Sequence, residues 1–216
     1  FTVPASLGYS GYYDNIGDMR NAGVELALNG VIFNKKNFYW DVNFNATHYT
    51  NKITMLPAER KTREVEGYKG YASGNKFIGE GLPLNTFFMK KYAGVDKTNG
   101  LPMWYKDVKD EEGNITGRET TTTYADADYY VTEESTIADF FGGIGTSVKA
   151  FGFDFSINCS YQIGGKQFDS TYQSFMASPT SSSAGYNFHK DLLNSWSAEN
   201  VNSNIPRMQW DDNNSV

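Results

Sequence analysis

The sequence has little cysteine, little histidine and no long apolar run. One cysteine, Cys159, excludes an internal disulfide framework, and the two histidines, His48 and His189, argue against a histidine-rich metal site. No stretch approaches the roughly 18 consecutive apolar residues that a membrane helix needs. Basic residues are also few: 19 Lys and Arg against 25 Asp and Glu give a net charge of −6, which is the wrong sign for binding nucleic-acid phosphates.

The two ends of the chain carry no recognisable start or finish. Phe1 opens it without a methionine or a targeting segment, and residues 211–216 are a polar run with no element to complete. We therefore expect the 216 residues to be a fragment of a longer protein.

What the chain does have is aromatic residues arranged in two-residue alternation. Its 15 Tyr, 15 Phe and 4 Trp make up 16% of the residues. Alternation runs through residues 22–32, and again through 38–49 after the polar turn 34–37. Successive side chains of a strand point to opposite faces, so each segment has one apolar and one polar face. The sequence predicts a β-hairpin over residues 22–49.

A second hairpin is predicted over residues 139–164. Phe140, Ile144 and Val148 fall in phase in a glycine-loosened strand, and Phe151-Gly152 makes the turn. Residues 153–164 then alternate strictly between apolar and polar side chains. Runs of 11–12 residues are longer than the usual 5–6 residues of a strand in a soluble sheet.

The segments outside these hairpins show no sustained period. Residues 84–106 are expected to form another hairpin around the Asn99-Gly100 turn, in water because Lys90 and Lys91 are adjacent and one of them would otherwise face lipid. Residues 50–83 and 107–138 are interpreted mainly as loops. A short helix is predicted where Phe188, Leu192, Leu193 and Trp196 share a face, with Asn187 as N-cap.

Two interpretations of the hairpins stay open. Tight turns on one side, excursions of 30–50 residues on the other and apolar-out, polar-in strands are typical of bacterial outer-membrane barrels. Aromatic residues beside the turns fit an interfacial girdle. The alternative is a soluble, aromatic-rich carbohydrate-binding β-sandwich, in which the apolar face is the shared core.

In the barrel interpretation the alternation assigns each strand residue to lipid or to the interior. The residues predicted to face lipid are Val24, Leu26, Leu28, Trp40, Val42, Phe44, Ile144, Val148, Phe155, Ile157, Cys159 and Tyr161. The residues predicted to face the lumen or a plug are Glu25, Asp41, Asn43, Asn45, Thr47, Asp154, Ser156, Asn158, Ser160 and Gln162. His48 is expected to reach the headgroup region.

Particular motifs resemble the SusC/RagA family of TonB-dependent outer-membrane transporters. Residues 15–26 match the strand entry N-x-G-x-x-x-N-x-G-V-E of that family. Further segments resemble the family in the same order along the chain: residues 92–96 with 100–102, 124–128, 141–145, 152–156, 161–166 and 196–200.

The resemblance implies an all-β fold, a part of a large antiparallel transmembrane β-barrel that has 22 strands in the family. Hairpins 22–49 and 139–164 would span the bacterial outer membrane, and residues 50–138 and 165–216 would be mainly extracellular loops. The family's plug is absent from this chain. The implied partners are a SusD-like surface lipoprotein that lids the barrel, the TonB complex acting through the plug, outer-membrane lipid, and an imported oligosaccharide or peptide.

Catalytic and metal-binding patterns find little support, so no enzyme, cofactor or metal is predicted. Asp126 with Asp128, or Glu133 with Glu134, lack the defined separation of a glycosidase pair and are interpreted as solvated loop residues. Ser195 and His189 do not share a helix face. The acidic group Asp107, Asp110, Glu111 and Glu112 lacks EF-hand spacing.

Two loop aromatics are candidates for ligand contact. Trp104 and Tyr105 follow the 96–100 turn, where their rings would be able to stack on sugars. The alternative, which we favour, is that they pack the small core of their own loop.

Overall fold

The structure is a computed structural model that describes residues 6, 8, 17–183 and 185–210. Phe1, the motif residues Asn15 and Ile16, and the polar run 211–216 lie outside the described residues, as does the side chain of Glu133. The chain divides into two compact units, one of residues 1–87 with 131–167, the other of residues 88–130 with 168–216.

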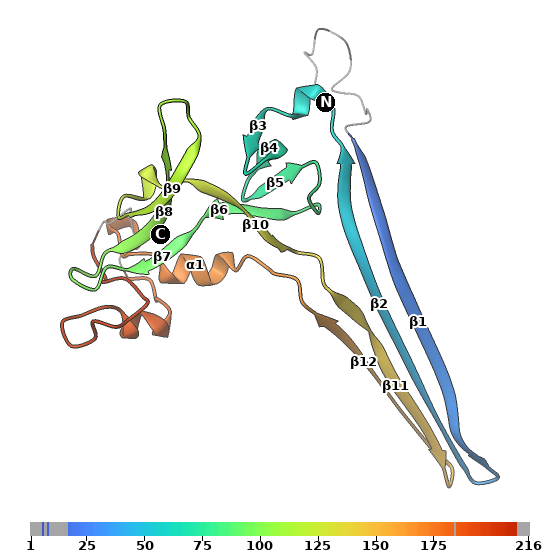
Figure 1. Ribbon diagram of the computed structural model, residues 1–216. Helices are drawn as coiled ribbons and strands as arrows, with labels where there is room; N and C mark the ends of the chain where they lie inside the picture. The colour runs from blue at the N-terminus through green and yellow to red at the C-terminus, as the bar shows by residue number, and fades with distance from the viewer. Residues whose placement is uncertain (1–5, 7, 9–16, 184, 211–216) are drawn as a thin grey trace. The chain divides into compact units, whose positions relative to one another are not determined.

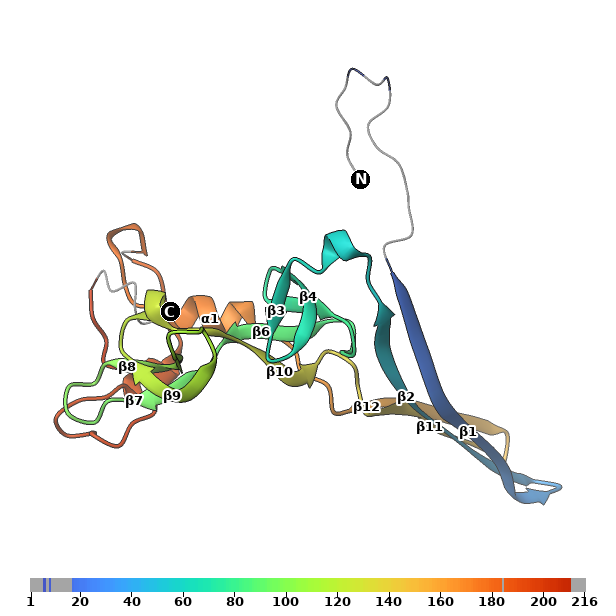
Figure 2. The same cartoon turned by 45° about the horizontal axis from the view of Figure 1, so that its top comes forward.

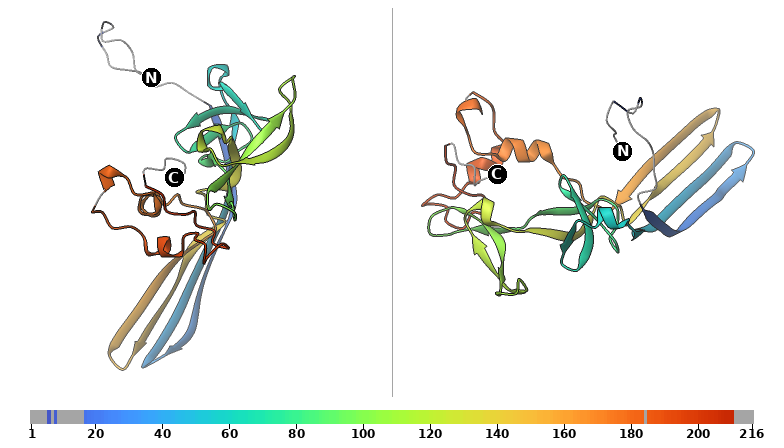
Figure 3. Two further views of the ribbon diagram at one scale, coloured as in Figure 1. Left: turned by 90° about the vertical axis from the view of Figure 1, so that its left-hand side faces the viewer. Right: turned by 90° about the horizontal axis from the view of Figure 1, so that it is seen from above.

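The first unit contains a four-stranded antiparallel sheet in the order β1-β2-β11-β12 (Figure 1). Its strands are β1 (Asp18–Lys35), β2 (Phe38–Met55), β11 (Phe140–Ala150) and β12 (Phe153–Ile163). Both predicted hairpins are therefore present, and the first is longer than the alternation indicated. β2 pairs with β11, which joins segments about a hundred residues apart in the sequence (Figure 3).

The two hairpin turns are tight because of their residues. Lys36-Asn37 links β1 to β2, and Phe151-Gly152 links β11 to β12. Phe151 and Gly152 both have positive φ, 53° and 88°, the geometry of the two-residue turns that match the twist of flanking strands. Glycine adopts a positive φ without strain, so Gly152 favours a turn at this position of the second hairpin.

A second sheet has the order β10-β6-β5-β4-β3. Its strands are short: β3 (Arg63–Val65), β4 (Tyr68–Ser73), β5 (Lys76–Gly79), β6 (Thr86–Lys90) and β10 (Tyr129–Ser135). The interpretation of residues 50–83 and 107–138 mainly as loops is thus corrected, since strands of this length, separated by turns, give too few alternations to register as a period. Buried Ile53, Leu56, Phe77, Leu82 and Phe87 form the core of the first unit.

The second unit contains the sheet β7-β8-β9 (Figure 2). Its strands are β7 (Tyr92–Val95), β8 (Pro102–Lys109) and β9 (Ile115–Thr121). The hairpin predicted over 84–106 is present as β7 and β8, with Val95 opposite Pro102. β9 was missed because its threonine-rich sequence was interpreted as solvated loop, whereas Thr120 and Thr121 lie opposite Tyr105 and Trp104.

Helical structure is sparse. The α-helix α1 (Ser170–Met176) begins at Asp169, whose side chain accepts a hydrogen bond of 2.8 Å from the Tyr172 N–H. Single 3₁₀ turns occupy Ala58–Arg60, Tyr124–Asp126, Ser181–Ser183 and Lys190–Asn194. Among the helices of the described residues, none is long and apolar enough to cross a bilayer.

The helix predicted near residue 190 differs from the expectation. It is a 3₁₀ helix that begins after His189, not after Asn187. Leu192 is buried whereas Leu193 is 89% exposed, so the two leucines do not share a face. With three residues per turn, neighbouring residues of a 3₁₀ helix point about 120° apart.

Candidate functional site

The register of the four-stranded sheet places all of its apolar phases on one face. Leu28 lies opposite Phe44, Phe44 opposite Ile144, and Ile144 opposite Cys159. Directly opposed residues point to the same side of a sheet, so this row crosses all four strands. The other residues predicted to face lipid lie in neighbouring rows of this same face, called here the apolar face: Val24, Leu26, Trp40, Val42, Val148, Phe155, Ile157 and Tyr161.

The apolar face is uncovered in the described part of the chain. Val24 is 72% exposed, Ile144 56% and Phe155 62%. A soluble sandwich would bury these side chains against a second sheet. The sandwich alternative is therefore not the structure observed, and an apolar surface of this extent indicates contact with lipid or protein.

One polar side chain on the apolar face escaped the sequence analysis. The Thr146 hydroxyl donates to the Asp41 carbonyl at 2.9 Å and accepts from Trp40 Nε1 at 2.8 Å. Both the hydroxyl and the indole are thereby satisfied without water. The pairing was invisible in the sequence because Trp40 and Thr146 belong to different hairpins.

Tyr161 crosses the apolar face in a similar way. Its phenol donates to the Asn45 carbonyl at 2.9 Å, and its ring stacks on Phe44 with a centroid separation of 6.2 Å. The Tyr161 side chain passes over Gly142 to reach this carbonyl, and a Cβ at Gly142 would lie 2.8 Å from the phenol oxygen. The glycine thus leaves room for a tyrosine two strands away from its hydrogen-bond acceptor.

The opposite face of the sheet is mainly polar. Glu25, Thr47 and Gln162 share a row with Phe141, and Asp41 shares one with Ser147 and Ser156. The other residues predicted to face the lumen lie on this face, called here the polar face: Asn43, Asn45, Asp154, Asn158 and Ser160. The amides of Asn43 and Asn158 close over Gly145, where a side chain would collide with both.

His48 lies at the far end of the apolar rows from the tight turns. Its Nδ1 is 2.6 Å from the Asp139 carbonyl oxygen, and its ring centroid is 5.0 Å from that of Phe140. The side chain therefore joins β2 to the start of β11.

The loop aromatics of the second unit pack against each other. Trp104 is only 5% exposed, with the rings of Tyr92 and Tyr124 at 6.2 and 5.1 Å. Trp104 therefore packs within the small core of its own loop, which is the alternative that the sequence analysis favoured. Tyr105 is half-buried beside Arg118 and Lys91, 5.9 and 5.8 Å from its ring centroid.

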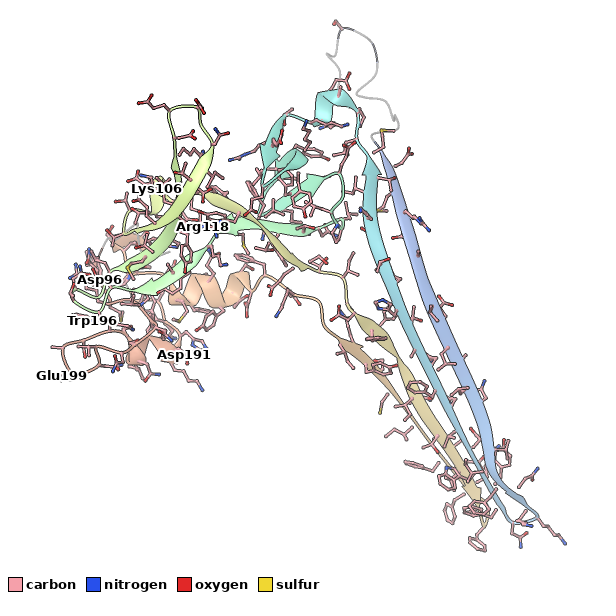
Figure 4. The ribbon with its side chains drawn as sticks, viewed as in Figure 1. Asp96, Lys106, Arg118, Asp191, Trp196 and Glu199 are labelled. Atoms are coloured by element: carbon pink, nitrogen blue, oxygen red, sulfur yellow. The ribbon has the colours of Figure 1, made fainter. Side chains whose placement is uncertain are left out.

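A charged network that the sequence analysis missed joins β8, β9 and β10. Arg118 Nε lies 3.3 Å from Asp107 Oδ1, and the Tyr130 phenol donates to the same oxygen at 2.8 Å (Figure 4 labels Arg118). The guanidinium also lies over the Tyr130 ring at 4.3 Å. Burial, and then the hydrogen bond to Asp107, raises the pKa of Tyr130. The network fixes three strands and leaves Asp107 engaged.

The acidic and nucleophilic candidates have structural partners. Asp110 accepts the Asn114 N–H at 2.8 Å within its own turn, which holds the pKa of Asp110 below its usual range. Asp128 accepts the Asp107 N–H at 2.8 Å, and Ser195 donates to the Leu192 carbonyl at 2.6 Å. Among the described residues, no three His, Cys, Asp or Glu side chains gather in a metal-binding group.

Relatives of known sequence cover most of this chain. It is 23% identical over 214 residues to TonB-dependent receptor P3 of Formosa agariphila, covering 95% of this chain and 20% of that protein. It is 25% identical over 192 residues to TonB-dependent receptor SusC of Bacteroides thetaiotaomicron, covering 87% of this chain and 18% of that protein. No family model matches.

Solved structures agree in fold. The RagAB peptide transporter superposes with a TM-score of 0.72 at 24% identity, over 96% of this chain and 22% of the matched chain. The RagAB peptide importer in its open-open state gives a TM-score of 0.70. The chain spans about a fifth of the length of the proteins it matches. These proteins are named as receptors and transporters, not as enzymes. The resemblance to the SusC/RagA family of TonB-dependent receptors is confirmed, in sequence and in an all-β antiparallel fold.

Proposed function

We propose that this chain is a part of the wall and the outer loops of a TonB-dependent transporter in the bacterial outer membrane. In this proposal hairpins 22–49 and 139–164 cross the bilayer, and residues 50–138 and 165–216 lie mainly on the extracellular side. The apolar face contacts lipid, and the polar face lines the lumen or contacts the family's plug.

The observation that carries the proposal is the apolar face, on which the polar side chain of Thr146 is satisfied by hydrogen bonds within the sheet. Four strands from two distant hairpins align their apolar residues on one side, and these side chains are exposed or only half-buried. In water such a surface is unfavourable by about 25 cal/mol for each Å². Contact with acyl chains carries no such cost. A closed barrel also pairs the backbone of every strand, because unpaired strand edges are unfavourable in hydrocarbon.

Strand length supports the same assignment. β11 and β12 have 11 residues each, close to the 9–11 residues that cross a bilayer as tilted strands. β1 and β2 have 18 residues and continue further. Beyond His48 the rows of the apolar face continue with Lys52 opposite Arg20, and two cations there support an aqueous position for this extension of the strands.

The transported solute is proposed to be an oligosaccharide or a peptide, taken up with a SusD-like lipoprotein lid and energised by TonB. SusC is among the sequence relatives, and the matching solved structures are of a peptide transporter. Tyr105 at the surface of the second unit is the remaining candidate for contact with the solute.

Fractionation of the full-length protein tests the proposal. It should sediment with outer membranes and migrate faster on a detergent gel before heating than after. Recovery as a soluble periplasmic protein would overturn the assignment. Growth of a deletion strain on oligosaccharides or on peptides as the limiting nutrient then decides the solute class, with the complemented strain as control.

A further inference from the structure

The turn end of the four-stranded sheet holds a hollow with positive charge. A cavity of about 640 Å³ lies between the Lys36-Asn37 and Phe151-Gly152 turns. Its lining includes Lys35, Lys36 and Lys149, with Asp154 as the one carboxylate among the lining residues. Asp154 is 3.8 Å from Lys149, and both lie on the polar face, so the remaining positive charge of the hollow rests with Lys35 and the turn residue Lys36. This is the reverse of the chain's net charge of −6.

Lys35 belongs to the apolar face. The register places Lys35 opposite Phe38, Phe38 opposite Ala150, and Ala150 opposite Phe153. Phe151 and Phe153 beside it are 82% and 80% exposed. A lysine at the edge of an apolar band extends its alkyl stem along that band and places its ammonium at the level of the headgroups.

A groove follows deeper on the same face. It has a volume of about 570 Å³ and is floored by the row of Gly30, Val42, Thr146 and Ile157, with Leu28, Phe44, Ile144 and Cys159 along its side. From Phe38 to Val42 along β2 is four residues, which corresponds to about 13 Å. Between the two rows Phe33 stacks on Trp40 with centroids 5.9 Å apart. A lipid whose headgroup lies at the lysines can therefore reach the groove with its acyl chain.

We propose that this end of the apolar face binds one anionic glycerophospholipid, and the inference rests on the membrane-spanning function proposed above. The phosphate lies between Lys35 and Lys36, the glycerol region contacts Phe38, Phe151 and Phe153, and one acyl chain lies in the groove over Gly30. Anionic headgroups are attracted by basic residues next to a membrane surface. In outer-membrane barrels the short turns are periplasmic, so the lipid belongs to the periplasmic leaflet.

The headgroup half is tested with the full-length transporter purified with lipid and measured by native mass spectrometry. The wild type should retain phosphatidylglycerol in preference to phosphatidylcholine. The double variant K35Q/K36Q should lose about 30-fold of this preference, as expected for removing two lysine–headgroup attractions. The matched control is K69Q/K109Q, which removes the same charge outside the four-stranded sheet and should retain the wild-type preference. Equal preference in K35Q/K36Q and the wild type would overturn the headgroup assignment.

The acyl half is tested by filling the groove. A Cβ at Gly30 meets only Val42 Cγ2, at an ordinary 3.9 Å, so Gly30→Leu fits and occupies the groove with an apolar side chain. This variant should lose retention of both lipids while keeping its heat-modifiable mobility. Unchanged retention would overturn the groove assignment.

The two proposals fail in different ways. A wild-type protein that does not fractionate with membranes contradicts the transporter proposal. A protein that inserts and imports its solute, yet shows no preference for phosphatidylglycerol, contradicts the lipid site alone.

Discussion

At the scale of single residues, the apolar face satisfies its polar groups within the sheet. Thr146 supplies the acceptor for Trp40 Nε1 at 2.8 Å and itself donates to the Asp41 carbonyl at 2.9 Å. In a membrane neither partner has a substitute. In the proposed lipid-facing position we therefore expect the hydroxyl to stabilise the sheet through both hydrogen bonds.

Replacing Thr146 by valine keeps the side-chain shape and leaves the indole N–H unpaired. We expect Thr146→Val to lower the free energy of unfolding of the lipid-reconstituted, full-length protein by about 1–3 kcal/mol. A urea titration followed by tryptophan fluorescence measures this. Thr146→Ser retains the hydroxyl and should be less destabilised than Thr146→Val. Wild-type stability in Thr146→Val would mean that water reaches the indole, against a lipid-facing position.

Glu80 links the segment that follows β2 to the end of β5 in the five-stranded sheet. Its Oε1 accepts the Leu56 N–H and lies 2.8 Å from Lys61 Nζ. The hydrogen bond from Lys61, and then that from Leu56, lowers the pKa of Glu80 below its ordinary value of 4.5. Because the folded form favours the ionised carboxylate, this stabilisation is present above pH 4.5 and is lost as the pH falls through the lowered pKa.

Glu80→Gln should therefore loosen the segment around Lys61 at neutral pH. We expect faster tryptic cleavage after Arg60 and Lys61 than in the wild type. Glu64→Gln is the matched control, since Glu64 is exposed and lies 3.8 Å from Lys69, a distance typical of weak surface pairs. Equal cleavage in the two variants would show that Glu80 does not hold the segment.

At the scale of elements, β12 alternates strictly between the apolar face and the polar face. Ile157 and Ser156 are neighbours, both exposed, on the apolar and the polar face. In water, arginine would be tolerated equally at two exposed positions of one strand. Across a bilayer the two positions differ, because arginine on a lipid face costs about 2–4 kcal/mol near the midplane.

We expect Ile157→Arg to reduce the amount of folded, heat-modifiable protein in outer membranes, and Ser156→Arg to leave it near the wild-type level. Quantitative blotting of unheated gels measures both. Equal levels would contradict the lipid-facing assignment of Ile157 and, with it, the orientation of the whole sheet.

Element length also decided how much of the fold the sequence revealed. β2, β11 and β12 present long runs of a single period, and both hairpins were predicted from them. β3 and β5 have three and four residues, too few for alternation to stand out from turns. The Thr-rich β9 was missed because its partner, β8, supplies the packing that makes it a strand.

At the scale of the whole molecule, the described four-stranded sheet has β1 and β12 at its edges. Unpaired edges beside an uncovered apolar face promote association in water. We expect residues 1–216, expressed alone, to aggregate without detergent, as light scattering will detect. A monomer that unfolds cooperatively in water and binds a glycan would support the sandwich alternative instead.

The candidate site was predictable in one respect and hidden in another. The alternation in the sequence separated the apolar from the polar residues of each strand. The register of the sheet then brings the apolar residues of all four strands together on the apolar face and the polar residues on the polar face. The Thr146–Trp40 and Arg118–Asp107–Tyr130 contacts join residues far apart in the sequence, so no local pattern announced them. The packing of Trp104 against Tyr92 and Tyr124, favoured from the sequence, acquired its partners only in the structure.

The sequence by itself determined the strand faces and the family resemblance, because a two-residue period and ordered motifs are properties of the chain's local chemistry. Only the tertiary structure decided that the apolar phases of both hairpins lie on one side of one sheet. The reason is register: shifting β11 against β2 by one residue would turn every side chain of one hairpin to the opposite face. Pairing across about a hundred residues, and not composition, makes the two hairpins a single surface.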